Sequence, residues 1–455
     1  MNAQRQRTKA EYRPTSRSLE TTVHTKVGDF TSLEAEWDDL YCHSLRATPF
    51  QSWAWLYSWW EVYSEGSYGL RLITLRDAGD LLVGLLPLMV RRRRLLFLGG
   101  VPGAPFLTPY KDVLVREGWE ELVAEAGTRA LEGLGGWWVA DLQELMPQAA
   151  AWDLFRKWDA PRTTRTSGGI DDFVLIRAKP WEQLLTSLNA NARKNARRTL
   201  RRLEEDGVRC EPAGLEDAEQ AARRLVALHR ELWQGRRIAP EHLTRRFETF
   251  VSIAAQRTTM RGIGRISEFR RDDTVVVSQF LLFDEDFVVA WAIGASQEAS
   301  QQYQFNTLSI WDAMNVARGR DAAFVSLTNY AIREKLRWAD EVVSSHRVIL
   351  GRTLVSWIPY SGYHTLRDGY YSLSSKAQLY VHSEVAPRWL KKATHGYYAL
   401  QSYVHSEDAP RWVKKATDSY YALRHEYGYH ALLYKYELVR TRRERPRSPK
   451  ASHSD

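Results

Sequence analysis

Short apolar runs separated by charged or glycine-containing turns recur in two groups along the chain. The first group has apolar runs at 70–75, 81–90 and 95–98, a helical pattern at 119–134 and an apolar run at 137–142. The second group has apolar runs at 260–269, 275–283 and 287–294, a helical pattern at 308–318 and an apolar run at 322–327. Short bounded runs are typical of strands, and three-to-four spacing is typical of helices. The order predicts two α/β (α+β) domains of similar topology with mixed, largely antiparallel sheets.

This pattern divides the chain into five segments. Residues 1–20 are polar and aperiodic, which predicts a disordered basic arm. The two domains are expected at 21–180 and 181–350, followed by a helical appendage at 351–440 and a basic tail at 441–455.

Aromatic residues are concentrated ahead of the first strands. The run 33–63 predicts two helices divided at Thr48-Pro49, and the second of them carries Trp53, Trp55, Tyr57, Trp59 and Trp60. These rings are too many for one narrow apolar stripe, so we expect some of them to line a cleft or a contact between domains.

Composition and charge narrow the class of protein. The chain has 455 residues and a formal charge of +9, with much of the excess at its two ends. Cys42 and Cys210 are the two cysteines, without metal-ligand spacing, so neither a disulfide framework nor a metal site is expected. No signal peptide and no uninterrupted apolar run of spanning length is visible, which favours a soluble, cytoplasmic protein.

Two clusters of cations have more than one interpretation. Residues 188–207 predict a basic helix with six cations over three turns, either a surface for RNA or donor phosphates, or a solvated helix balanced by Glu204, Glu205 and Asp206. The four arginines Arg91–Arg94 resemble a phosphate clamp, but between two strands they are also typical of an exposed turn that blocks edge pairing.

The stretch 303–338 combines a polar loop, a helix and a strand. Asn306 or Thr307 can cap the start of the helix, and Gly319 lies where it should end. Backbone N–H groups at a helix start form a general anion site, so a phosphate-bearing acyl donor could bind there. The alternative is a helix that simply packs on a sheet.

Several segments, taken in order, carry a family resemblance. They are FQSWAW, LLVGLLPL, LLFLGG, TPYKDVLV, NARKNARRTLRRLEEDG, ALHRELWQGR and IREKLRW. Their order over about 33–348 resembles the CelD/BcsL group of GNAT-like acyltransferases, which is similar to the FemAB aminoacyltransferases. The resemblance implies two tandem GNAT-like domains and acyl transfer, with acyl-CoA as the donor.

The resemblance also implies roles for individual residues. His229 falls on a His-to-Trp segment of the family as a base or acceptor ligand, and Lys335 falls on its closing lysine, so these two are the catalytic candidates. Asn306 and Thr307 are candidates for binding the donor, although the sequence has no glycine between Gly294 and Gly319 where the family's donor loop has glycines. Candidates for binding the acceptor are Ser278, Gln279, Trp291, Tyr303, Trp233 and Trp338. Each of these residues could equally be structural, as could the family-matching Tyr110, Lys111 and Asp112.

A near-exact duplication follows the domains. The run YVHSEVAPRWLKKATHGYYAL from Tyr380 is repeated 23 residues later from Tyr403. Each copy predicts a helix with one apolar face and adjacent lysines. We expect these helices, spanning 380–423, to pack on the body, on each other or on a protein partner, with a membrane surface as a further alternative.

These observations lead to one function and two alternatives. The predicted function is an N- or O-acyltransferase that modifies an amino sugar, a polysaccharide precursor or a similar polar acceptor. The first alternative is a FemAB-like transferase that uses aminoacyl-tRNA. The second is a non-catalytic binding or scaffold protein. The sequence leaves all three open.

Overall fold

A computed structural model describes residues 18–65, 68–100, 107–158, 164–233, 240–328 and 333–353. The expected appendage and basic tail, including the duplicated segment 380–423, lie outside the described residues from 354 onward. The arm expected at 1–20 lies outside them up to residue 17.

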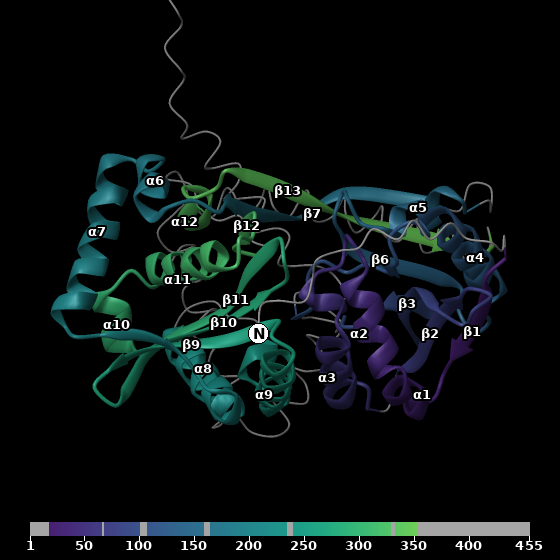
Figure 1. Cartoon of the computed structure of the whole chain (residues 1–455), viewed down its shortest axis with the longest axis horizontal. Helices are drawn as coiled ribbons and strands as arrows, with labels where there is room; N and C mark the ends of the chain where they lie inside the picture. The colour runs from purple at the N-terminus through teal and green to yellow at the C-terminus, as the bar shows by residue number, and fades with distance from the viewer. Residues whose placement is uncertain are drawn as a thin grey trace, which may run out of the picture.

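One continuous mixed sheet runs through the whole described chain (Figure 1). Its order is β1-β2-β3-β4-β6-β13-β7-β12-β11-β10-β9-β8, with β5 paired to β3. The strands of the first half are β1 (Glu20–His24), β2 (Gly69–Arg76), β3 (Leu82–Arg91), β4 (Arg94–Phe97), β5 (Leu114–Val115), β6 (Val139–Leu145) and β7 (Thr164–Arg177). Those of the second half are β8 (Arg209–Pro212), β9 (Gly264–Arg271), β10 (Thr274–Phe283), β11 (Phe287–Ala295), β12 (Phe324–Ser326) and β13 (Glu341–Gly351).

Helices cover both halves of this sheet. The first half has α1 (Val27–Ser32), α2 (Glu34–Cys42), α3 (Trp53–Tyr63), α4 (Glu120–Gly133) and α5 (Ala151–Arg156). The second half has α6 (Trp181–Thr186), α7 (Ala190–Glu205), α8 (Ala218–Leu232), α9 (Arg245–Met260), α10 (Gln297–Gln302), α11 (Phe305–Gly319) and α12 (Arg333–Leu336).

The two halves repeat the same topology. In the first half, β2, β3 and β4 form antiparallel hairpins, and α4 then leads to β6, which pairs in parallel with β4. In the second half, β9, β10 and β11 form the hairpins, and α11 leads to β12, which pairs in parallel with β11. The repeat predicted from the sequence is therefore confirmed. Each parallel pair needs a crossover connection, and the helices α4 and α11, which the periodicity predicted, provide it.

The last strand of each half pairs with the other half. β7 pairs with β12, and β13 pairs with β6, while β7 and β13 also pair with each other along most of their length. Figure 1 shows both strands running across the top of the molecule from one half to the other. The predicted boundary at residue 180 follows β7, so backbone hydrogen bonds connect the two halves across that boundary.

The aromatic helix α3 forms the second connection between the halves. Its side chains are buried except for Glu61 and Val62. Trp55 packs edge-on against Phe250 of α9 with ring centroids 5.0 Å apart, and the Arg257 guanidinium lies 5.0 Å from the Tyr57 ring centroid. The aromatic crowding seen in the sequence therefore marks a contact between domains.

Some predicted boundaries are wrong. The predicted arm extends into β1, where Glu20 pairs with Arg76. The strand predicted at 260–269 begins at Gly264, because Met260 is the last residue of the unpredicted helix α9 and residues 261–263 form the turn after it. The helix predicted at 308–318 begins earlier, because α11 starts at Phe305 with Gln304 as its N-cap residue, shortly after the unpredicted helix α10. Asn306 and Thr307 lie in the first turn of α11 and therefore do not cap it.

Candidate active site

The parallel strands β11 and β12 separate partway along their length. They pair from Phe287 with Phe324 to Val289 with Ser326, and β11 then continues to Ala295 without β12 beside it. Beyond Val289, β11 has β10 as its one strand neighbour in the described sheet. Ligands of open α/β sheets bind where parallel strands diverge at their carboxyl ends. We call the space between these strand ends the β11–β12 opening.

The backbone after β12 explains the separation. Leu327 donates its N–H to Val174 O at 2.9 Å, and Thr328 O accepts from Val174 N at 3.3 Å, so the chain after β12 stays beside β7 where its pairing with β11 has ended. Thr328 has φ = 59°, in the left-handed region that β-branched residues rarely adopt. A second contact holds this turn, because Tyr110 Oη lies 2.5 Å from Ser326 Oγ.

His229 of α8 lies on the β11 side of the opening. Its Nδ1 is 2.7 Å from Ile293 O, beyond the last β11–β12 pair, and its Nε2 is 3.1 Å from His242 Nδ1. A carbonyl oxygen only accepts, so we assign the proton of His229 to Nδ1 and its lone pair to Nε2. His242 then donates from Nδ1, which leaves the lone pair of His242 on its Nε2.

Burial determines the protonation of His229. The residue is 8% exposed. Burial, with a smaller effect of the Arg230 charge, lowers the pKa of the His229 imidazole to about 4, although the bond to Ile293 acts in the opposite direction. His229 is therefore neutral at pH 7 and positions His242 through a hydrogen bond.

Aromatic rings surround this histidine pair. His242 stacks on Phe247 with centroids 4.4 Å apart, and Phe247 in turn stacks on Trp291 of β11 at 6.1 Å. Trp291 is half-buried and contacts Trp55 of the first half at 5.2 Å. Trp233, at the end of α8, lies 6.1 Å from the His229 ring. Trp291 and Trp233 are thus brought to the His229 side of the opening.

Lys335 and Trp338 lie on the β12 side. Lys335 Nζ donates to the carbonyl oxygen of Leu327, the first residue after β12, at 2.6 Å. Burial lowers the pKa of the Lys335 ammonium to about 8. Trp338 is 2% exposed and stacks on Trp181 of α6 with centroids 5.7 Å apart. Lys335 is therefore placed at the end of β12, whereas Trp338 serves the packing behind it.

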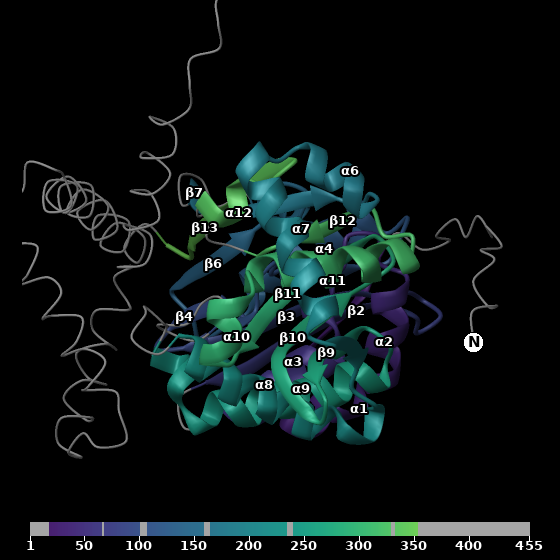
Figure 2. The same cartoon turned by 90° about the vertical axis from the view of Figure 1, so that its left-hand side faces the viewer.

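The start of α11 is held by the basic helix α7. Tyr303 donates its hydroxyl to Asp206, and burial together with this carboxylate raises the pKa of Tyr303. Arg202 donates to Gln302 O at 3.5 Å. Figures 1 and 2 place α7 beside α11 in both views. Tyr303 is therefore an anchor between α7 and α11.

The two donor-binding candidates differ in exposure. Asn306 is half-buried, and its side chain forms no hydrogen bond with any described residue. Thr307 is fully buried, and its hydroxyl donates to Gln304 Oε1 at 3.2 Å. Asn306 can therefore meet a ligand at the helix start through its side chain, whereas Thr307 holds the turn.

Ser278 and Gln279 lie behind the opening. Both are fully buried on β10. Ser278 pairs with Gly294, against which the backbone of α8 packs, and Gln279 donates to Asp312 Oδ2 of α11 at 2.8 Å. The structure therefore does not bring these two residues to the opening with His229 and Lys335.

Three features of the site are absent from the sequence-based prediction. His242 is an isolated histidine in a polar stretch, and no periodic pattern marks it as part of a site. The separation of β11 from β12 depends on Val174, which is far away in sequence. The sequence suggests that Asp206 balances positive charge on α7, whereas in the structure its carboxylate also accepts a hydrogen bond from the Tyr303 hydroxyl. Only the His spacing on either side of Trp233 could have suggested the His229–His242 pair.

The family-matching segment Tyr110–Asp112 connects parts of the first half. Lys111 Nζ forms a buried ion pair with Glu144 Oε2 at 3.0 Å, and Asp112 accepts from Ala150 N and Ala151 N at the start of α5. These contacts give Lys111 and Asp112 structural roles in the first half.

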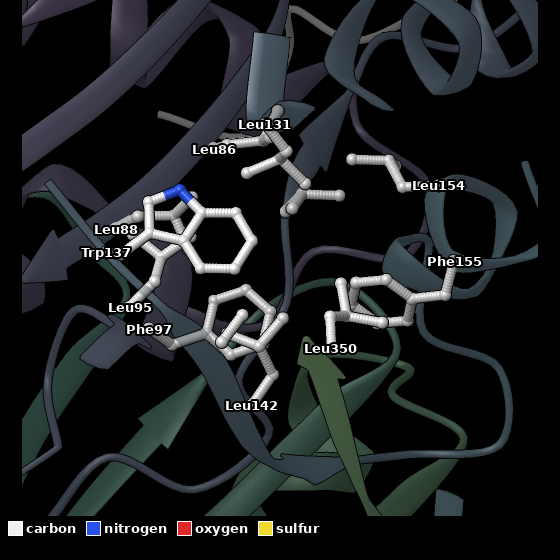
Figure 3. Close-up of a pocket in the computed structure, with 12 residues that line it drawn as sticks. Leu86, Leu88, Leu95, Phe97, Leu131, Trp137, Leu142, Leu154, Phe155 and Leu350 are labelled. Atoms are coloured by element: carbon white, nitrogen blue, oxygen red, sulfur yellow. The ribbon is translucent and has the colours of Figure 1, made fainter. Parts of the chain in front are cut away.

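An apolar cavity inside the first half is too small for a substrate. Its volume is about 10 Å³, roughly the room for one water molecule. Figure 3 shows the side chains from the sheet, α4 and α5 that close around it, among them Leu86, Trp137 and Leu350. It is a packing gap in the core.

The described residues contain neither a metal-binding cluster nor a membrane-spanning helix. Within these residues no group of three or more His, Cys, Asp or Glu side chains could hold a metal ion. No helix in the same part of the chain is long and apolar enough to cross a membrane.

A family model matches the second half. The acetyltransferase (GNAT) domain model covers residues 190–357, which include α7, the β11–β12 opening and Lys335. The second half is thus similar to GNAT acetyltransferase domains, and the fold class predicted from the sequence, α/β with GNAT-like halves, is confirmed. No curated protein matches the chain.

Solved structures with a similar fold share little sequence with this chain. FemX is 12% identical, with 72% of this chain and 96% of FemX covered and a TM-score of 0.48. A tandem GNAT protein from the clavulanic acid biosynthesis pathway is 13% identical, with 73% and 98% covered and a TM-score of 0.37. L-PGS from Bacillus licheniformis is 11% identical, with 63% and 85% covered and a TM-score of 0.41. Likenesses at this level carry no information about substrate.

Proposed function

We propose that the protein transfers an acyl group from a thioester donor, acyl-CoA, to an amine or hydroxyl of a polar acceptor at the β11–β12 opening. The observation that carries this proposal is the opening itself, which lies within the GNAT-matching segment and has His229 on one side and Lys335 on the other.

The donor fits the opening as an extended chain. Beyond Val289, β11 has no described strand on the side away from β10, and an amide-containing arm can pair with such an edge as an added strand, except at Ile293 O, which already accepts from His229. Its phosphates would lie at the start of α11, beside Asn306 and the cations of α7. These cations replace the glycine-rich loop that the sequence lacks.

The chemistry is direct attack. The acceptor nitrogen or oxygen attacks the thioester carbonyl carbon, a tetrahedral intermediate forms, and the carbon–sulfur bond breaks to release a thiolate. The acceptor's proton passes to His242 Nε2, held in place by His229, and reaches the leaving thiolate or solvent. Lys335 stabilises negative charge on the donor at the end of β12.

The acceptor class follows from the resemblance to the CelD/BcsL group and from the aromatic rings beside the histidines. We propose an amino sugar or polysaccharide precursor, because the faces of sugar rings pack on aromatic side chains such as Trp291 while their hydroxyl groups need polar partners.

A second candidate, transfer from aminoacyl-tRNA, is favoured by one observation. A hollow of about 390 Å³ on α7 is lined by Ala190, Arg193, Lys194, Arg197, Arg198 and Arg201. Five cations around one hollow suit a polyanion, and neither Lys194 nor Arg198 pairs with a carboxylate in the described chain.

Calorimetric titration of the purified chain distinguishes these functions. We expect saturable binding of one of acetyl-, succinyl- or long-chain acyl-CoA, and turnover with an amino-sugar acceptor. Lys335→Met should weaken donor binding about tenfold, the usual effect of losing one charge-assisted contact. Lys157→Met, which removes an exposed lysine of the first half, is the matched control and should bind normally.

Two results would overturn the acyl-CoA proposal. Binding of charged tRNA alone, lost on Lys194→Gln with Arg198→Gln, would establish the second candidate. Binding of neither donor would leave the non-catalytic scaffold as the function.

A further inference from the structure

Cations and one exposed tryptophan gather on the rim of the first half, far in sequence from the opening. The rim is formed by the two-residue turn Arg92-Arg93 between β3 and β4, by Trp138 before β6, and by Arg352 after β13. Backbone bonds hold these three segments together, because Trp138 N donates to Arg93 O at 2.8 Å and Arg352 N donates to Trp138 O at 3.0 Å. We call this surface the arginine rim.

Charge on the arginine rim is of one sign. Arg91, Arg92, Arg93 and Arg352 form no ion pair with a carboxylate in the described chain, and Arg352 directs its guanidinium to the carbonyls of Glu132 and Leu134. The Arg93 guanidinium lies 5.5 Å from the ring centroid of Trp138, which is 59% exposed. An exposed tryptophan ring beside cations suits a surface that is both anionic and partly apolar.

The backbone conformation of the turn is unfavourable for arginine, so stability does not explain the two arginines there. Arg92 and Arg93 have φ of 47° and 65°. A two-residue hairpin turn with both φ positive is the geometry for which Asn-Gly is preferred, and other residues are strained there. Strain kept in a pair of exposed cations suggests a function for their charge.

The composition and position of the rim favour a lipid surface over a strand of nucleic acid. The hollow suited to a polyanion is on α7, in the other half, whereas the arginine rim consists of a turn and strand ends. Tryptophan among arginines is the composition that places a protein at the boundary between lipid headgroups and hydrocarbon.

The sequence that follows the rim reinforces this charge. Residues 354–455 begin two positions after Arg352 and contain 16 Lys and Arg against nine Asp and Glu. Positive charge in this segment and on the arginine rim is attracted to an anionic surface.

We propose that the arginine rim is a docking surface for an anionic lipid bilayer, which holds the transferase against a membrane. Arg92 and Arg93 meet lipid phosphates, Trp138 inserts among the headgroups, and binding is weakened by salt.

Co-sedimentation of the full chain with vesicles tests this proposal. The probes are vesicles of phosphatidylcholine with and without phosphatidylglycerol, and we expect binding to the anionic vesicles only. Arg92→Asn with Arg93→Gly should weaken that binding about thirtyfold, the ordinary contribution of two arginines near an anionic surface. The same change relieves the turn, so the melting temperature should stay equal or rise. A loss of binding through unfolding would lower it.

Two further variants make the result specific. Lys194→Gln with Arg198→Gln removes the same charge from α7 and should leave vesicle binding unchanged, whereas Trp138→Ser should weaken it. The proposal is overturned if the arginine-rim variant binds anionic vesicles as the native chain does, or if it loses binding to RNA while vesicle binding persists.

Discussion

At the scale of single residues, the protonation of His229 determines what the site can do. A histidine whose pKa is near 4 is a weak base, so it cannot be the main proton acceptor at neutral pH. Its value lies in geometry, since its Nδ1–H is fixed on Ile293 O and its Nε2 accepts from His242. His242 thereby gains a defined tautomer.

This burial makes stability depend on pH. The folded-state pKa of His229 is about 4, and its ordinary value is 6.5. The unfolded chain therefore binds more protons between these values, and the stabilisation present above pH 6.5 is lost as pH falls toward 4. From pH 7.5 to pH 5 the native chain should lose roughly 2 kcal/mol more than His229→Asn, whose amide keeps a donor for Ile293 O.

Urea unfolding of both proteins at the two pH values measures this difference. Every other titrating group, including His242 and Arg230, is shared by the two proteins. Equal losses for both proteins would show that His229 is not the buried neutral histidine described above.

At the scale of elements, the contact of α8 with β11 positions the histidine pair. Gly294 permits this contact, because a Cβ there would lie 2.4 Å from His229 N and 2.7 Å from Leu225 O. Both are backbone atoms, so neither can rotate away.

Gly294→Ala should therefore push α8 off β11. We expect it to destabilise the protein by about 2 kcal/mol or more, the cost of overpacking against rigid atoms. Gly319→Ala is the matched control, because its Cβ would meet nothing within 4 Å at the end of α11. Chemical denaturation should leave the control unchanged or slightly more stable, and an equal effect of the two substitutions would refute the close contact.

Elements with strong local signals were predictable from the sequence. The hairpins around β3 and β10 and the helices α4, α7 and α11 have clear periodicity and turn residues. β13 was missed because polar residues such as Ser344 and Ser345 interrupt its pattern, and β7 because its partners come from distant sequence. The roles of His229 and Lys335 remain predictions, because they come from the family resemblance of their segments. The opening between them could not be predicted from the sequence, because it involves the path of Leu327 beside the distant Val174.

At the scale of the whole molecule, the last strand of each half pairs with a strand of the other half, and we expect the two halves to unfold together. β13 carries Arg347, which forms a buried bidentate pair with Asp141 of β6, both contacts at 2.6 Å. The final strand of the second half is thus held in the core of the first. Two domains joined only by a linker would unfold separately, whereas strands shared across a sheet unfold together.

Arg347→Leu tests this coupling, because it leaves Asp141 buried without its cation. We expect a loss of about 3–5 kcal/mol, as for other broken buried pairs. Arg197→Leu, which removes an exposed pair with Glu182, should cost about 1 kcal/mol or less.

Hydrogen exchange gives the decisive reading, since amides of β11 and β12 in the other half should lose protection as much as those of β6. If only the first half loosens, and calorimetry shows two transitions, the halves are independent and the opening does not depend on the exchange. If both loosen together, the distant pair Arg347–Asp141 maintains the geometry of the site, because β7 lies between β13 and β12 and holds the turn at which β12 leaves β11.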